Sequence, residues 1–171
     1  KSIEEYTFED CEGLKSITIP NSITSIGGGA FKGCVSLTSI TIPSSVKSIE
    51  EYTFEDCTGL TSITIPAGVS SIGYGAFSGC TGLTSITIPA SVTSIREDAF
   101  ENTAWYNKQP NGLIYAGKVA YEYKGTMPAN TKITLKSDTK AISACAFSGC
   151  TGLTSVTIPA SVTSIEDNFY G

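Results

Sequence analysis

The amino-acid sequence repeats itself with a period of twenty-three residues. The spacing is clearest for five phenylalanines, which lie at Phe8, Phe31, Phe54, Phe77 and Phe100. Cysteine, leucine, paired isoleucine and proline residues recur with the same offset, and the pattern returns at Phe147, forty-seven residues after the fifth phenylalanine. A fixed period of this length predicts stacked structural repeats, so the chain is expected to form an elongated solenoid.

A single row of twenty-three residues contains too few apolar side chains to offset the entropy lost when it becomes ordered, so the rows must stack on one another. Thr38 to Ile42 alternates polar and β-branched apolar residues, which predicts a short strand with Ile40 and Ile42 inward. Stacked rows then give a parallel sheet. Residues 76–83 predict a single helical or 3₁₀ turn, and residues 91–95 predict a second extended segment.

The row F-x-x-C-x-x-L-x-x-I-x-I-P-x-x-V-x-x-I, as in Phe77 to Ile95, resembles the BspA-type leucine-rich repeat, also called the Treponema pallidum type. The resemblance implies a right-handed, curved leucine-rich-repeat solenoid that is mainly β, with a parallel sheet of short strands on its concave face. It also implies a surface protein of gut or oral bacteria or of mucosal protozoa. Some members of that family are adhesins for host matrix proteins, and their ligand contacts would lie at the variable positions.

One rung carries an insertion at about residues 103–130, where Thr103 and Tyr106 replace the expected Cys and Leu. Two β-rich runs around Gly117 predict a hairpin over residues 112–124. The insertion contains five aromatic candidates for ligand contact: Trp105, Tyr106, Tyr115, Tyr121 and Tyr123. They either anchor a protein interface or pack a hairpin that would be barely stable alone onto the solenoid. The sequence leaves both alternatives open.

The outward strand positions predict an uncharged band of hydroxyl groups on the concave face. Six of its members are candidate ligand contacts, at Ser39, Thr41, Ser62, Thr64, Ser85 and Thr87. The band is either a hydrogen-bonding floor for a peptide or glycan, or an ordinary solvated strand surface, because Ser and Thr suit such a surface.

Five of the six cysteines fall in one repeat column, at Cys11, Cys34, Cys57, Cys80 and Cys150. Stacking would place them about 5 Å apart with parallel Cβ vectors, which suits a ladder of buried free thiols better than disulfides. Cys145 lies in another column and is expected to be more exposed, and pairing between Cys145 and Cys150 remains open. The spacing contains no zinc motif, and the chain has no His.

Charge and composition exclude several classes of function. The net charge is -5, which disfavours binding to nucleic acid, and the absence of His removes the most common general base. Acidic pairs such as Glu50-Glu51 favour a solvated negative stripe over a calcium site, because no calcium-loop motif is present. We predict no catalytic, cofactor or metal site, and no apolar run is long enough to span a membrane.

These observations predict one leucine-rich-repeat domain over residues 1–171, as a segment of a longer protein. The predicted function is a non-catalytic cell-surface or secreted interaction scaffold, whose partner is a protein or glycan and whose role is adhesion to host or neighbouring cells. A passive spacer that presents another domain is the alternative. An enzyme is the third hypothesis, which would need a cleft built from Asp, Glu, Lys or Tyr.

Overall fold

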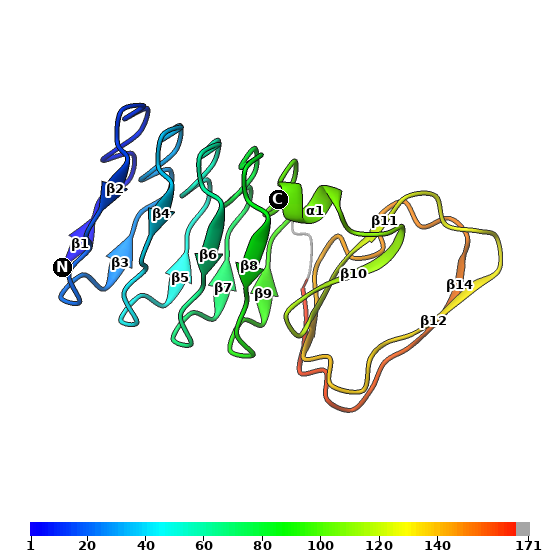
Figure 1. The fold of residues 1–171 in the computed structure, drawn as a ribbon. Helices are drawn as coiled ribbons and strands as arrows, with labels where there is room; N and C mark the ends of the chain where they lie inside the picture. Colours follow the sequence, from blue (N-terminus) through cyan, green and yellow to red (C-terminus); the bar gives the residue numbers. More distant parts are fainter. Residues whose placement is uncertain (167–171) are drawn as a thin grey trace.

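The computed structural model describes residues 1–166 as an elongated β-solenoid, in which successive rungs lie side by side along the stack (Figure 1). Residues 167–171, the end of the predicted domain, lie outside the described residues. Each regular rung contributes two short strands separated by turns. The predicted solenoid of parallel strands is therefore confirmed, as is the second extended segment in residues 91–95, where β9 (Ser94–Ile95) forms.

The first strand of each rung belongs to a ladder that runs along one side of the stack. Its parallel pairs keep the period of the sequence, since Ser2 pairs with Ser25 and Ser71 with Ser94. The ladder contains β1 (Ser2–Ile3), β3 (Ser25–Ile26), β5 (Ser48–Ile49), β7 (Ser71–Ile72), β9, β11 (Val119–Lys124), β13 (Ala141–Ile142) and β15 (Ser164–Ile165). Backbone pairing is continuous from β5 to β9 and from β11 to β15.

The second strand of each rung forms a ladder that the insertion interrupts. It contains β2 (Ser16–Ile17), β4 (Ser39–Ile40), β6 (Ser62–Thr64), β8 (Ser85–Thr87), β12 (Thr131–Thr134) and β14 (Leu153–Thr157). Strand β2 pairs with β4, β6 with β8 and β12 with β14, all in parallel. In β6, the exposed Ser62 and Thr64 flank the buried Ile63, which is the predicted alternation.

The segment after the first strand is a series of tight turns and not a regular helix. Some of its amides bond three residues back, as Cys80 N–H does to Phe77 O. Others bond the next rung, as Phe77 N–H does to Ala99 O. Gly75 and Gly79 have φ angles of +56° and +72°, a left-handed conformation that breaks a right-handed helix.

Phenylalanine rings form the centre of the core. The five rings from Phe8 to Phe100 stack with centroid separations of 5.3, 5.6, 5.3 and 5.8 Å. Beside them, the thiol of each buried cysteine donates to a phenylalanine carbonyl of the preceding rung, with Cys57 Sγ lying 3.1 Å from Phe31 O. None of the six cysteines forms a disulfide bond, so Cys145 and Cys150 do not pair. Burial raises the pKa of the Cys34 thiol to about 12, as expected for an apolar thiol ladder.

The predicted hairpin is present, and one of its two strands is part of the stack. Strand β10 (Gly112–Ala116) pairs antiparallel with β11, and β11 pairs in parallel with β13 in the four-stranded order β10-β11-β13-β15. Strand β11 therefore occupies a rung position of the first ladder. The physical reason is hydrogen bonding, because without β11 this edge of β13 would lose its backbone partners.

Candidate functional site

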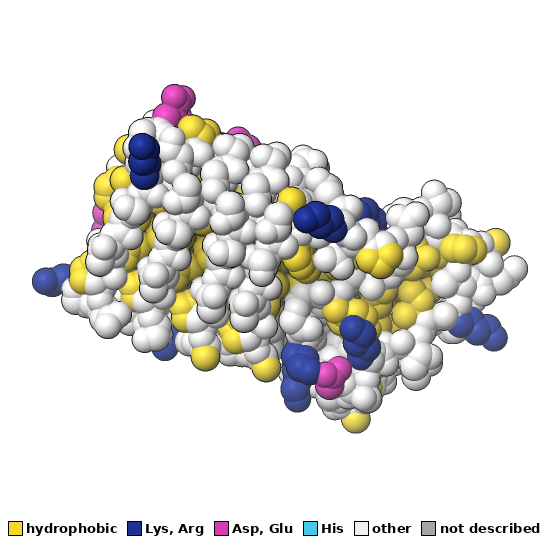
Figure 2. Space-filling view, in the orientation of Figure 1, with side chains coloured by type: hydrophobic (Ala, Val, Ile, Leu, Met, Phe, Trp, Pro, Cys, Tyr) yellow, Lys and Arg dark blue, Asp and Glu magenta, His cyan; other side chains and the backbone are white. Residues whose placement is uncertain are grey.

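The six predicted members of the hydroxyl band (Ser39, Thr41, Ser62, Thr64, Ser85 and Thr87) are all exposed. Figure 2 shows that the face carrying β4, β6 and β8 has few charged side chains and that apolar atoms are visible between its rungs. Within residues 1–166, none of the six hydroxyls has a hydrogen-bond partner. The band is therefore free to donate and accept hydrogen bonds.

A neighbouring column shows that free hydroxyls are not the rule on this surface. The Thr84 hydroxyl lies 3.2 Å from Thr61 O, and that of Thr38 lies 3.4 Å from Lys15 O, each one rung back. The same bond to a backbone carbonyl one rung back is made by the hydroxyls of Thr24, Ser70, Thr154 and Thr163. Hydroxyl columns are thus of two kinds, one used within the solenoid and one directed to solvent.

A hollow of about 290 Å³ brings four of the predicted contacts together. Its rim carries the hydroxyls of Ser39, Thr41, Ser62 and Thr64, and its remaining walls are Ile40, Ile42, Ile63 and Pro66. This arrangement combines uncharged donors and acceptors with an apolar surface. It suits a polar but uncharged ligand group, such as a peptide backbone or a sugar, and it offers no nucleophile paired with a base.

Two of the predicted aromatic contacts close the end of the phenylalanine stack. Trp105 and Tyr121 both meet Phe100 edge to face, with centroid separations of 5.1 and 5.4 Å. The Tyr121 hydroxyl accepts a hydrogen bond from Phe100 N–H at 3.4 Å, whereas the corresponding amides of the four preceding rungs donate to a backbone carbonyl. Because its side chain is only 3% exposed, Tyr121 leaves the group of candidate ligand contacts.

Tyr106 fastens the helix α1 (Ala104–Asn107) to the hairpin. Its hydroxyl donates to Glu122 at 2.9 Å, and the Lys124 ammonium lies 5.0 Å from its ring centroid. Lys124 also donates to three carbonyls at the end of the helix, those of Tyr106, Asn107 and Gln109. Burial, followed by the Glu122 hydrogen bond, raises the pKa of Tyr106. The contacts of Tyr106 therefore mainly hold α1 against the hairpin.

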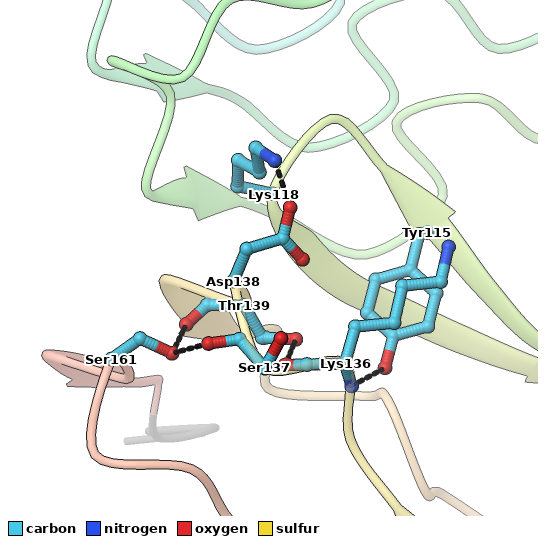
Figure 3. A network of polar contacts seen from close by, with 7 residues as sticks. All are labelled: Tyr115, Lys118, Lys136, Ser137, Asp138, Thr139 and Ser161. Atoms are coloured by element: carbon cyan, nitrogen blue, oxygen red, sulfur yellow. Dashed lines mark hydrogen bonds and ion pairs between the residues drawn. The ribbon is translucent and has the colours of Figure 1, made fainter.

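Tyr115 joins the hairpin to the turn between β12 and β13 (Figure 3). Its hydroxyl accepts from Lys136 N–H at 3.0 Å, and the Lys136 ammonium lies 4.1 Å from its ring centroid. In the same network, Lys118 forms an ion pair with Asp138 that lowers the pKa of Asp138. The hydroxyl of Ser161 donates to the carbonyls of Ser137 and Thr139 from the next rung.

Tyr123 is half-buried and lines a second hollow, of about 230 Å³, beside the insertion. Glu97, Asp98, Glu122 and Cys145 also line it. Within residues 1–166, no three His, Cys, Asp or Glu side chains gather closely enough to hold a metal ion. Over the same residues, no helix has both the length and the apolar character needed to cross a bilayer.

The sequence interpretation overlooked the tyrosines that accompany the acidic stripe. Tyr6 and Tyr52 directly follow Glu5 and Glu51 in their turns. Tyr74 occupies the position of Glu51 in the next rung. Tyr52 and Tyr74 meet edge to face at 5.3 Å. The Tyr74 hydroxyl donates to Asp98 at 2.9 Å, and this bond raises the pKa of Tyr74 to about 12. The near-identity of residues 2–20 and 48–66 is the signal that could have identified the surface.

Comparison with known families agrees with this geometry. A profile of the BspA-type leucine-rich repeat region matches six copies of the repeat, in residues 1–107 and 118–171. No curated protein matches the sequence.

Two crystal structures share the fold. A leucine-rich repeat protein of T. pallidum is 26% identical with a TM-score of 0.63, and the match covers 96% of this chain and 65% of that one. A leucine-rich cell surface protein of Faecalibacterium prausnitzii is 29% identical with a TM-score of 0.51, covering 91% and 42% of the two chains. The chain thus spans less than two thirds of either structure.

Proposed function

Because the chain belongs to the BspA-type leucine-rich repeat family, we propose that it is a non-catalytic scaffold that binds a protein or glycan at a cell surface or after secretion. Proteins with these repeats are typically surface proteins used for protein interaction. The proposed biological role is adhesion to host cells or to neighbouring cells.

The observation that carries this proposal is the unpaired hydroxyl band. Its hydroxyls stand on strands fixed by the ladder, with Ser62 opposite Ser85 and Thr64 opposite Thr87. Adjacent rungs are about 4.8 Å apart, so the hydroxyls form a regular grid. Binding of a ligand to such a grid costs little conformational entropy of the protein, since the hydrogen-bonding groups are already in place.

The hollow at Ser39, Thr41, Ser62 and Thr64 is the proposed centre of contact. It contains no charged group, which favours an uncharged stretch of polypeptide or a neutral sugar over an ionic ligand. The apolar walls supply contact area that a purely polar strand surface would lack.

Binding of the purified protein to a panel of matrix proteins and glycans tests the proposal. For a ligand that binds saturably, we expect the double variant Thr41→Val and Thr64→Val to weaken binding about tenfold, because two hydrogen bonds of about 0.7 kcal/mol each are lost. The matched control is Thr38→Val with Thr84→Val, which makes the same change in the column whose hydroxyls bond within the solenoid.

Two outcomes would contradict adhesion through this face. One is the absence of saturable binding across the whole panel, and the other is an equal loss of affinity in the control variant. Replacement of the rows by unrelated repeats of equal length then tests the spacer alternative. A spacer would keep its function after that replacement, whereas an adhesive surface would lose it.

A further inference from the structure

The net charge of -5 conceals an uneven distribution of charge along the solenoid. Twelve of the sixteen Asp and Glu residues lie in residues 1–103, whereas six of the eleven Lys and Arg residues lie in residues 104–166. Three of those six lysines, Lys132, Lys136 and Lys140, belong to residues 131–142, which we term the lysine rung. The protein therefore carries a local positive surface that its overall composition does not reveal.

The repeat does not call for lysine at these positions. In the rung of β8, the equivalent residues are Ser85, Pro89 and Thr93. In the rung after the lysine rung, they are Ser155, Pro159 and Thr163. The regular rungs repeat a lysine in only one of these columns, at Lys47. The basic character thus appears in one internal rung and is lost again in the next.

The backbone of the lysine rung is nevertheless that of a regular rung. Leu135 N–H donates to Thr157 O at 3.0 Å, and Thr139 N–H donates to Lys136 O at 3.0 Å. The equivalent residues of the regular rung that carries β6 make the same two contacts, from Ile65 N–H and Val69 N–H. Lysine therefore replaces Ser, Pro and Thr without altering the fold, so the scaffold does not explain the change.

The lysine rung presents only polar groups to solvent. In residues 132–140, the exposed residues are Lys132, Thr134, Lys136, Ser137, Asp138 and Lys140. Over the described residues 1–166, the ammonium groups of Lys132 and Lys140 have no hydrogen bond or ion pair within the chain. A surface without an exposed apolar side chain lacks the anchor on which protein interfaces depend.

The hairpin brings a fourth lysine to this surface. Lys118 O accepts a hydrogen bond from Lys140 N–H at 2.8 Å, so the two lysines lie on neighbouring rungs. Asp138 is ion-paired with Lys118 (Figure 3), and the Lys118 hydrogen bond, followed by the charges of Lys118 and Lys136, lowers the pKa of Asp138. The chain thus places one carboxylate among these ammonium groups, which leaves most of their charge uncompensated.

We propose that the lysine rung binds an acidic polysaccharide, with the sulfate or carboxylate groups of the sugar chain against the ammonium groups of Lys132, Lys136 and Lys140. An ammonium group is a point charge that accepts an anion in many orientations, unlike the planar fork of Arg. The hydroxyls of Thr134 and Ser137 can bond to those of the sugar. An acidic polypeptide is disfavoured, because the rung exposes no apolar anchor. This contact is additional to ligand binding at the hydroxyl band.

The experiment measures binding of the purified protein to dextran sulfate, carboxymethyl dextran and neutral dextran by isothermal titration calorimetry. We expect saturable binding to at least one charged dextran and none to neutral dextran. The two charged polymers distinguish sulfate from carboxylate as the recognised group. Polyglutamate of similar length is the fourth probe, and tighter binding of polyglutamate than of either charged dextran would assign the surface to an acidic polypeptide and overturn the proposal.

Matched variants locate the contact. Lys132→Ser with Lys140→Thr introduces the residues that other rungs carry, and should weaken binding about fivefold, as expected for the loss of two exposed charge contacts. The control Lys15→Thr with Lys47→Thr makes the same kind of change in the regular rungs, and should weaken binding less than about twofold.

Three results would overturn the proposal: equal weakening by the two pairs, saturable binding to neutral dextran, or no binding to either charged dextran. Lys136→Met gives a further check, since it removes the charge but keeps an apolar stem against the Tyr115 ring, and it should also weaken binding. Thr41→Val with Thr64→Val should leave binding to the charged dextrans unchanged, which separates this result from failure of the proposed adhesive function.

Discussion

The regular rungs in residues 1–103 and the interrupted region in residues 104–166 are built in different ways. In the regular rungs, each contact of the core is repeated at every period, as in the Phe stack and the Cys ladder. In the interrupted region, the main contacts occur once, such as the bonds of Lys124 to the end of α1 and the packing of Tyr115 against Lys136.

The last regular rung also differs from the rungs before it in how two of its apolar residues are covered. Ile63 and Ile65 are 4% and 2% exposed, whereas Ile86 and Ile88 of the last regular rung are half-buried. The residue types are the same, but β8 has no paired strand on the side of the insertion. The end of the second ladder at β8 thus leaves Ile86 and Ile88 partly uncovered, although Leu83, Val92 and Ile95 of the same rung are fully buried. Where the pattern breaks, individual contacts close the rest of the core.

The largest expected effect compares one substitution in the two regions. Phe54→Ala should lower the free energy of unfolding by about 3–5 kcal/mol, because Phe54 is fully buried between two stacked rings. Phe147→Ala should lower it by only about 1–2 kcal/mol, because Phe147 is half-buried against a smaller cluster. Chemical denaturation followed by circular dichroism measures both, and equal losses would mean that the two regions do not differ in packing.

Much of the fold was predictable because it repeats. The column of Ile40, Ile63 and Ile86 predicts inward strand positions, and the Cys column predicts free buried thiols. The hairpin was also predictable, since its turn lies at Gly117 between two β-rich runs. Because the rows stack, equivalent residues of successive rows make the same contact, and the repeated residue types reveal it.

Single contacts between residues distant in the sequence were not predictable. The sequence of β11 does not show that Tyr121 points inward to bond Phe100, because the preceding rung sets that direction. The candidate contacts show the same limit, since the hydroxyls of Thr41 and Thr84 look alike in the sequence and only Thr84 bonds to a neighbouring rung. The Tyr6 ring likewise packs against Gly29 of the next rung, a contact that the sequence of neither rung shows.

An intermediate effect is expected at the junction of the two regions. Tyr121→Phe keeps the edge-to-face contact with Phe100 but removes the oxygen that accepts Phe100 N–H. A buried amide without an acceptor should lower the free energy of unfolding by about 1 kcal/mol. Hydrogen exchange at Phe100 should also become faster than at Phe77, whose amide keeps its carbonyl partner. Unchanged stability and exchange would show that this hydroxyl does not close the regular stack.

The smallest effect concerns the ion pair that joins the hairpin to the turn after β12. A hydrogen bond from Lys118 holds the pKa of Asp138 below its ordinary value of 3.8. A lowered carboxyl pKa stabilises the folded state above the unfolded pKa, and this contribution is lost as the pH falls through the folded pKa. Lys118→Met should raise the pKa of Asp138 toward 3.8, measured by carboxyl ¹³C NMR, with little change in stability at neutral pH because both groups are exposed to solvent. Lys132→Met removes the same charge elsewhere and should leave that pKa in place. An unchanged pKa in Lys118→Met would show that this ion pair does not connect the hairpin to the rung beside it in solution.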